Sequence, residues 1–200
     1  ARYTAMIATR VVLMAIAIGV FWRFYVRSFP LRIDHWGFVT GVVGAVLWIG
    51  LCHLQLESGL LKLIGLSEEL LGARDGVNPF ESYPESGERM VFLGFRFALL
   101  VVTVPIAEEL FLRGFFMRVM DAVEWQDLPL AEIGTTGLVA GTLYGVATHP
   151  SEFIAAAVWF SLVTLLMVKT NKFWNCVVAH AVTNLILGIY VMTTGTWSLW

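Results

Sequence analysis

Three charged residues lie close together in an apolar part of the sequence. Glu108, Glu109 and Arg113 occur between Met90 and Met120, where most other residues are hydrophobic. A charged side chain at the centre of a membrane-spanning helix costs about 2.5 to 3.5 kcal/mol on insertion scales, so such residues usually face the interior of a bundle and serve a function. A buried glutamate can take a proton from water, which is the first step of amide hydrolysis.

Spacing along a helix divides the roles of the two glutamates. Glu109 and Arg113 are four residues apart, so they lie on one helix face and are expected to pair. Glu108 points about 100° away around the helix axis. We therefore expect Glu108 to bind water and remove its proton, while Arg113 neutralises and orients Glu109. A purely structural pair explains Glu109 and Arg113 equally well, because buried ion pairs also occur as architecture.

Three further polar residues occur in later apolar segments at similar depth, namely His149, His180 and Asn184. We expect His149 to hold the same water or to donate to the leaving amine. His180 and Asn184 are one helical turn apart, as donors to the oxyanion of a hydrolysed amide would be. Either histidine alone would more often be a packing residue, but together these groups indicate one buried site.

A metal-assisted reaction is a second interpretation of the same residues. Glu108, His149 and His180 form a two-histidine, one-carboxylate set of a kind that zinc accepts. The sequence has no His-Glu-x-x-His motif and no Gly-x-Ser-x-Gly turn. We expect no obligatory cofactor, with a divalent metal as the alternative.

The composition is typical of a polytopic membrane protein. Of the 200 residues, 58% are hydrophobic and 14% are charged, which is unlike a soluble domain. The net charge of -2 gives no indication of nucleic-acid binding. Cys52 and Cys176 lie in apolar segments without a Cys-x-x-Cys pair, so neither a disulfide framework nor a zinc knuckle is predicted.

Apolar runs of up to about 20 residues predict an all-α bundle of about six membrane spans. The predicted spans are about Thr4–Trp22, Gly37–Leu56, Arg96–Arg118, Gly134–His149, Phe153–Val168 and Phe173–Met192. Pro105 cannot donate to the carbonyl of Val101, so a kinked or broken helix is expected one turn before Glu108.

We expect a single integral membrane domain, residues 1–200. Its N-terminal spans and polar loop would occupy residues 1–89, and the core with the catalytic motifs residues 90–194. A short amphipathic helix is predicted at Leu60–Leu71, followed by a polar connector at Gly72–Arg89.

Glycine spacing and loop charges predict how the spans are arranged. Small residues at helical spacing allow close helix contact in the second and fourth spans, and they are Gly37, Gly41, Gly44, Gly137, Gly141 and Gly145. His149 continues the second of these ridges, so it should face a packed neighbour. The basic loop before Asp34 is assigned to the cytoplasm, and Lys169 and Lys172 return the chain to that side.

The ordered polar residues resemble the motifs of a known membrane protease family. Over about Met90 to Thr194, three motifs resemble those of the CAAX prenyl protease and bacteriocin-processing family, and they are Glu108-Glu109-x-x-x-Arg113, His149 and His180-x-x-x-Asn184. The resemblance implies that the first glutamate and the middle histidine activate water, and that the last histidine and the asparagine form the oxyanion site. The family usually has Phe four residues before the middle histidine, whereas this chain has Gly145 there, preceded by Tyr144.

The C-terminal segment is similar to a bacterial branch of that family that accompanies exosortase systems. The similarity covers Phe173–Tyr190 and a following Thr-Gly-Thr-Trp. It implies the bacterial inner membrane as the location and an exosortase-like sorting enzyme as a partner.

The sequence therefore predicts an intramembrane endopeptidase. Glu108 would act as general base on a peptide bond of a membrane-associated protein or peptide, with the lipid bilayer and no nucleic acid as further partners. The alternative is a non-catalytic assembly or immunity factor of a protein-sorting system, in which the same polar groups brace helices. A third interpretation is proton-coupled transport through Glu108 and His149, which a chain without paired inverted repeats disfavours.

Overall fold

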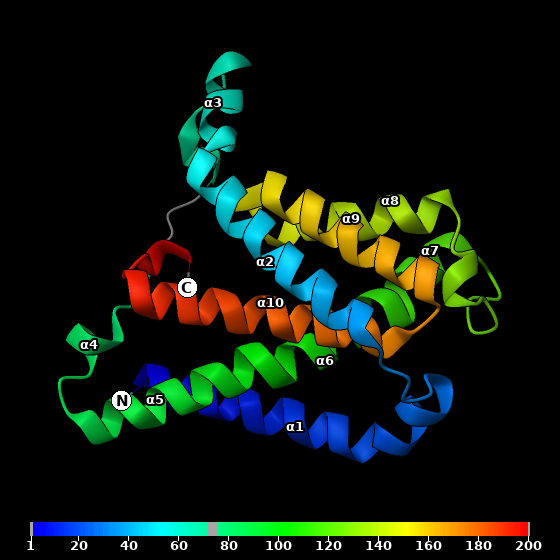
Figure 1. Ribbon diagram of the computed structural model, residues 1–200, viewed down its shortest axis with the longest axis horizontal. Coiled ribbons are helices and arrows are strands. Elements are labelled where there is room, and N and C mark those ends of the chain that lie inside the picture. Colours follow the sequence, from blue (N-terminus) through cyan, green and yellow to red (C-terminus); the bar gives the residue numbers. More distant parts are fainter. Residues whose placement is uncertain (1, 72–75, 200) are drawn as a thin grey trace.

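The protein is helical in the part that the computed structural model describes, residues 2–71 and 76–199 (Figure 1). These residues form no β-strand, which confirms the all-α prediction. Five helical stretches are long and apolar enough to cross a membrane, so the protein is a polytopic helical membrane bundle. The five are α1 (Arg2–Ser28), α2 (His35–Leu54), the stretch Ser86–Asp121, the stretch Pro150–Thr170 with α9 (Phe153–Thr170), and α10 (Phe173–Thr194).

The fourth predicted span, about Gly134–His149, forms a shorter helix. α8 (Thr135–Thr148) has 14 residues. It is therefore about 21 Å long, less than the roughly 30 Å of a bilayer core. α8 packs along α9 (Figure 1). Five of the six predicted segments thus have the length to cross a bilayer on their own.

Short helices occupy the connections between the longer ones, and one more follows α10. The connecting ones are α3 (Leu56–Leu63), η1 (Glu68–Leu71), α4 (Pro79–Ser82), η4 (Leu130–Glu132) and η5 (Pro150–Glu152), and the one after α10 is η6 (Trp197–Leu199). The predicted helix at Leu60–Leu71 has the wrong bounds, because α3 begins at Leu56 and ends before Gly65, whose φ of 73° is left-handed. Residues 72–75 of the predicted connector lie outside the described residues, and its remainder contains α4 and the first turn of α5 (Ser86–Ala98).

Close packing of α2 on α10 confirms the contact predicted from the glycines of the second span. A Cβ atom on Gly41 would lie 2.6 Å from the Cβ of Val182 and 2.8 Å from the carbonyl oxygen of Ala179. A Cβ atom on Gly37 would lie 3.1 Å from the carbonyl oxygen of Asn175. Only a residue without a side chain allows this approach, which holds α10 firmly against α2.

Polar contacts join the two basic loops at one end of the bundle, as the charge pattern predicts. Lys172 Nζ lies 2.6 Å from Asp34 Oδ2, and Asn175 Nδ2 donates to Asp34 Oδ1. The Trp174 indole donates to the carbonyl oxygen of Phe29 at 2.7 Å. The Lys172 ammonium also holds the pKa of the Asp34 carboxyl below its usual value. These contacts fix the start of α10 relative to the start of α2.

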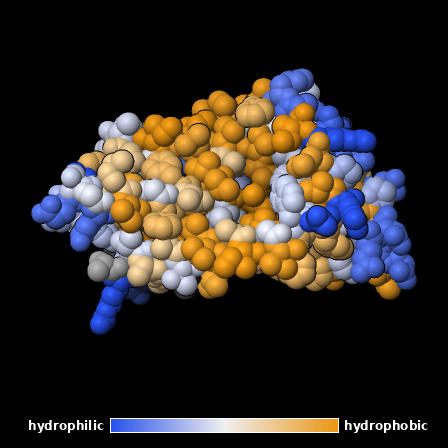
Figure 2. All heavy atoms as spheres, turned by 90° about the horizontal axis from the view of Figure 1, so that it is seen from below, coloured by the Kyte–Doolittle hydropathy of each residue, from blue (hydrophilic) through white to orange (hydrophobic). Residues whose placement is uncertain are grey.

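A broad apolar surface surrounds the middle of the molecule. Figure 2 shows one face on which hydrophobic residues form a band between two hydrophilic ends. α1 contributes large exposed hydrophobic side chains, among them Leu13, Ile16, Val20 and Phe24. Exposed apolar surface of this extent is what the hydrocarbon core of a bilayer covers.

Candidate active site

The stretch Ser86–Asp121 carries both candidate glutamates and changes its helical geometry twice. Its segments are α5, the π-turn η2 (Leu99–Thr103), α6 (Val104–Phe111), the π-turn η3 (Leu112–Phe116) and α7 (Met117–Asp121). π-turns inside α-helices are rare and frequently mark functional sites. The broken or kinked helix predicted near the glutamates is therefore present as two π-turns that flank α6.

Pro105 explains why the first π-turn depends on another helix. The amide of Val104 donates to the carbonyl of Leu99, five residues back. The next amide in this pattern would be that of Pro105, which has no N–H to offer the carbonyl of Leu100. Asn184 Nδ2 on α10 donates to that carbonyl instead, at 2.8 Å. The defect that Pro105 creates thus holds the Asn184 side chain in place.

Glu109 and Arg113 form the buried pair that their spacing predicts. Both side chains are fully buried, and Arg113 Nη1 donates to Glu109 Oε2 at 2.5 Å. Arg113 Nη2 also donates to the carbonyl of Phe160, at 3.2 Å, and lies 3.5 Å from Thr164 Oγ1. His180 Nδ1 lies 3.0 Å from Glu109 Oε1. The pair therefore ties three helices together, namely α6, α9 and α10.

Glu108 points away from this pair, as its position one residue earlier predicts. Its side chain is 19% exposed, whereas that of Glu109 is fully buried. The Tyr144 hydroxyl on α8 donates to Glu108 Oε1 at 3.2 Å, and His180 Nε2 lies 3.8 Å from Glu108 Oε2. The imidazole of His180 therefore lies between two carboxylates, with one ring nitrogen facing each.

One cavity of about 450 Å³ brings together four of the six predicted site residues, which are Glu108, His149, His180 and Asn184. Side chains from α2, α5 and α9 complete its wall, including Trp48, Arg96 and Trp159. Glu109 and Arg113 do not line this cavity and lie behind it. The structure thus separates a group of residues that faces the cavity from a buried pair that supports it.

His149 is positioned by the end of α8 and by two aromatic rings. It follows the last residue of α8, and its Nδ1 lies 3.0 Å from Thr148 Oγ1 and 3.2 Å from the carbonyl oxygen of Gly145. Its ring packs edge-on against Trp48 of α2 and also contacts Phe160 of α9. The packed environment that the glycine ridge predicts for His149 is therefore present.

The alternative metal set finds no grouping in the described residues. Among residues 2–71 and 76–199, no three His, Cys, Asp or Glu side chains lie together as metal ligands would. Glu108 and His180 lie near each other, and His149 faces the same cavity through its contacts at the end of α8.

Comparison with protein families supports the assignment that the motifs suggest. Residues 90–186 match the sequence model described as type II CAAX prenyl endopeptidase Rce1-like. Over these residues, slightly less than half of the chain, the sequence is similar to that of the Rce1-like family. Neither curated proteins nor solved structures give a significant match. The Rce1-like family is one of membrane peptidases, and the match does not distinguish the exosortase-associated branch.

The Rce1-like segment contains all six predicted site residues, and the structure accounts for its unusual Gly145. A Cβ atom on Gly145 would overlap the ring of Phe160, so no larger side chain fits there. An aromatic ring from α9 thus occupies the space beside His149. The neighbouring Tyr144 supplies a hydroxyl to Glu108.

Sequence reasoning missed three contacts of the candidate site. Tyr144 was noted only as a departure from the motif, although a tyrosine hydroxyl inside a membrane needs a partner and Glu108 lies at similar depth. Trp159 packs on His180, with ring centroids 4.8 Å apart, and its indole donates to Thr183 Oγ1. Thr183 donates onward to the carbonyl of Gly41, so this chain of contacts orients the His180 ring from α2. No sequence spacing links these helices.

Proposed function

We propose that the protein is a membrane-embedded peptidase in which Glu108 activates water to hydrolyse a peptide bond of a membrane-associated protein or peptide. The observation that carries this proposal is the single cavity lined by Glu108, His149, His180 and Asn184. Its volume of about 450 Å³ falls within the usual range of ligand sites, about 300 to 1,000 Å³. The match to the Rce1-like family model supports the peptidase chemistry.

The proposed reaction begins with a water molecule bound to Glu108. Glu108 takes one proton from this water while the water oxygen forms a bond to the carbonyl carbon of the substrate. The carbonyl π electrons move to oxygen, and this oxyanion accepts hydrogen bonds from His180 Nε2 and Asn184 Nδ2. Glu108 then gives its proton to the amide nitrogen as the carbon–nitrogen bond breaks, so that protons and electrons balance.

The charges around His180 support its role as a donor. Each ring nitrogen of His180 faces one carboxylate, and an ionised carboxylate only accepts hydrogen bonds. With a hydrogen on each ring nitrogen, Nδ1–H donates to Glu109 and Nε2–H is available on the side of Glu108. Asn184 uses one amide hydrogen for the carbonyl of Leu100 and keeps its second for the oxyanion.

We propose that His149 helps to hold the attacking water by accepting a hydrogen bond from it. In the tautomer in which Nδ1–H donates to the carbonyl of Gly145, Nε2 carries no proton and accepts a hydrogen bond. A water held between Glu108 and His149 would then have its lone pair directed by both groups. This assignment needs no metal ion, and a chelator should leave the activity unchanged.

The test compares cells that make the wild-type chain with cells that make Glu108→Gln. Mass spectrometry of peptide termini in the membrane fraction identifies the bond that only the wild type cleaves. With a peptide of that sequence, purified Glu108→Gln should be slower by about 10² to 10⁴, the usual contribution of a general base. Glu85→Gln, a change on the exposed surface at the start of α5, is the matched control and should retain full activity.

Identical peptide termini in the two strains would refute the peptidase assignment. They would favour the non-catalytic assembly or immunity factor, because that role needs the bundle and not the carboxylate. A purified wild-type enzyme that loses activity with chelator would refute the metal-independent reaction alone.

We further propose the bacterial inner membrane as the location and an exosortase-like sorting enzyme as a partner. The similarity of Phe173–Tyr190 supports both. Crosslinking in membranes of a strain that carries an exosortase should recover the two proteins together, and recovery of neither from the other would contradict the partnership.

A further inference from the structure

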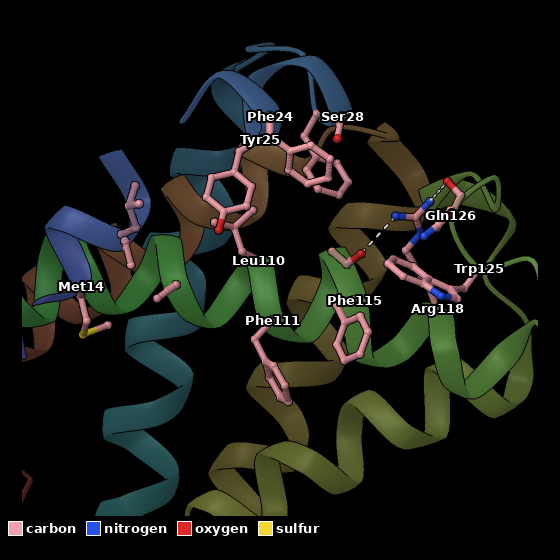
Figure 3. Close-up of a pocket in the computed structure, with 15 residues that line it drawn as sticks. Met14, Phe24, Tyr25, Ser28, Leu110, Phe111, Phe115, Arg118, Trp125 and Gln126 are labelled. Carbon is pink, nitrogen blue, oxygen red and sulfur yellow. Dashed lines mark hydrogen bonds between the residues drawn. The ribbon is translucent and has the colours of Figure 1, made fainter. Parts of the chain in front are cut away.

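A second cavity, larger than the candidate active site, lies on the other side of α6. It has a volume of about 740 Å³ and lies between α1 and the segment from α6 to α7 (Figure 3). Figure 3 shows Phe111 and Phe115 from one wall and Met14, Phe24 and Tyr25 from the other. None of the six predicted site residues lines it. α6 thus separates two cavities, with Glu108 on one side and Ala107 and Leu110 on the other.

The shape and lining of this cavity fit a hydrocarbon chain. Along α1 its wall extends from Met14 to Ser28, which is about 21 Å at 1.5 Å per residue. Most of the lining side chains are apolar, and all except Trp125 and Gln126, in the loop after α7, belong to membrane-spanning helices or their ends. An acyl chain in such a cavity is stabilised by the burial of its methylene groups, whereas a polar ligand would find few hydrogen-bond partners there.

One end of the apolar cavity continues into a cationic one. A neighbouring cavity of about 340 Å³ shares Ser28, Phe29 and Arg118 with it and is also lined by Arg32 and Lys172. The N–H groups of Arg118 donate to the carbonyls of Gly114, Gln126 and Leu128, which are neutral hydrogen-bond partners.

The charges at this end favour an anionic group. Asp127 lines the smaller cavity, and Asp34 binds Lys172. These two carboxylates offset two of the three cations, so one positive charge remains in excess, beside the exposed Arg27 in the last turn of α1. An apolar channel that ends in uncompensated positive charge matches an amphiphile with a negative headgroup.

We propose that the two cavities together bind one anionic phospholipid of the leaflet that faces the basic loops. An acyl chain occupies the cavity between α1 and α6, and the phosphate lies beside Arg32. The lipid would fill the space between α1 and the helix that carries Glu108, and so hold α6 against the rest of the bundle. This binding requires no cleavage, so its test is independent of the proposed peptidase function.

The acyl chain is tested by filling the cavity from α1. The purified chain in neutral detergent is titrated with phosphatidylglycerol, and native mass spectrometry gives the bound fraction. Ala17→Trp places a large ring in the cavity and should weaken binding about tenfold or more, because each displaced methylene contributes to affinity. Ala15→Trp changes the same helix outside the cavity lining and should bind like the wild type. Equal binding by the two variants would overturn the proposal.

The headgroup is tested by charge removal at the same end. Wild type should prefer phosphatidylglycerol to phosphatidylcholine, and Arg32→Gln should weaken phosphatidylglycerol binding about fivefold. Arg23→Gln removes an exposed charge near the end of α1 outside both cavity linings and should have little effect. Equal affinity of the wild type for both lipids would overturn the headgroup assignment. Displacement of the lipid by a prenylated peptide that is cleaved would overturn the lipid assignment and give the cavity to substrate.

Discussion

The buried pair of Glu109 and Arg113 makes a sharp prediction for stability. Arg113→Met keeps the length of the side chain and removes its charge, which leaves the fully buried carboxylate of Glu109 without its arginine partner. Breaking a buried pair in this way costs about 3 to 5 kcal/mol. The lost contacts to Phe160 and Thr164 add about 0.5 to 1.5 kcal/mol each at most, so the unpaired charge dominates.

A second change separates the charge effect from general loss of packing. In the double variant Glu109→Gln/Arg113→Met, the carboxylate is gone and the glutamine oxygen still accepts from His180 Nδ1. The double variant should therefore be more stable than Arg113→Met alone. The coupling energy between the two substitutions should be about 3 kcal/mol, the upper end of the usual range for residues in contact.

The free energy of unfolding can be measured in mixed micelles titrated with dodecyl sulfate. The eight tryptophans of the chain give the fluorescence signal. If Arg113→Met lowered the free energy of unfolding by less than about 1 kcal/mol, the pair would contribute no more than an exposed ion pair does. That result would refute the claim that an unpaired buried charge sets the cost. A double variant no more stable than Arg113→Met would show that packing, and not charge, sets the cost.

Three other changes test separate parts of the structure. Gly41→Val should lower the free energy of unfolding by about 1 to 3 kcal/mol through overlap with α10, whereas Gly50→Val in the same helix meets open space and should have a much smaller effect. Asp34→Asn should lower the melting temperature at pH 7, because the folded-state pKa of Asp34 lies below its unfolded value of about 3.9. That difference should vanish as the pH falls through the folded-state pKa, and a constant difference would contradict the linkage. Tyr144→Phe should reduce kcat of peptide hydrolysis about tenfold, the value of one hydrogen bond to a charged group, and an unchanged kcat would argue against its contact with Glu108.

Most of the fold could be predicted because a bilayer demands long apolar helices. The runs that became α1, α2, α9 and α10 are visible in the sequence. Their bounds differ from the prediction by at most two residues, except that α1 continues six residues beyond Trp22, to Ser28. The prediction was weaker for Leu60–Leu71, where the left-handed backbone of Gly65 follows the end of α3 at Leu63. Spacing also predicted the pairing within α6 and η3, since residues four apart on one helix meet without help from the fold.

The rest of the candidate site depends on contacts between residues on different helices, and their spacing in the sequence does not predict these contacts. The hydrogen bond from Tyr144 to Glu108 requires the rotational setting of both α8 and α6. The contact of Asn184 with the carbonyl of Leu100 requires a π-turn, for which Pro105 was the one sign in the sequence. The catalytic roles of the six residues stay predictions until Glu108 is tested.

The two π-turns divide the long helix into three segments. Each turn contains one residue more than an α-helix would use, and the wider turn absorbs that residue. Losing one residue within Leu99–Thr103 or within Leu112–Phe116 would therefore restore an α-turn and leave the flanking segments on nearly the same faces. Losing one residue within α6 would instead rotate the helix on one side of the deletion by about 100°. The two turns are thus the places where the length of this helix can change in evolution while the glutamates stay in register.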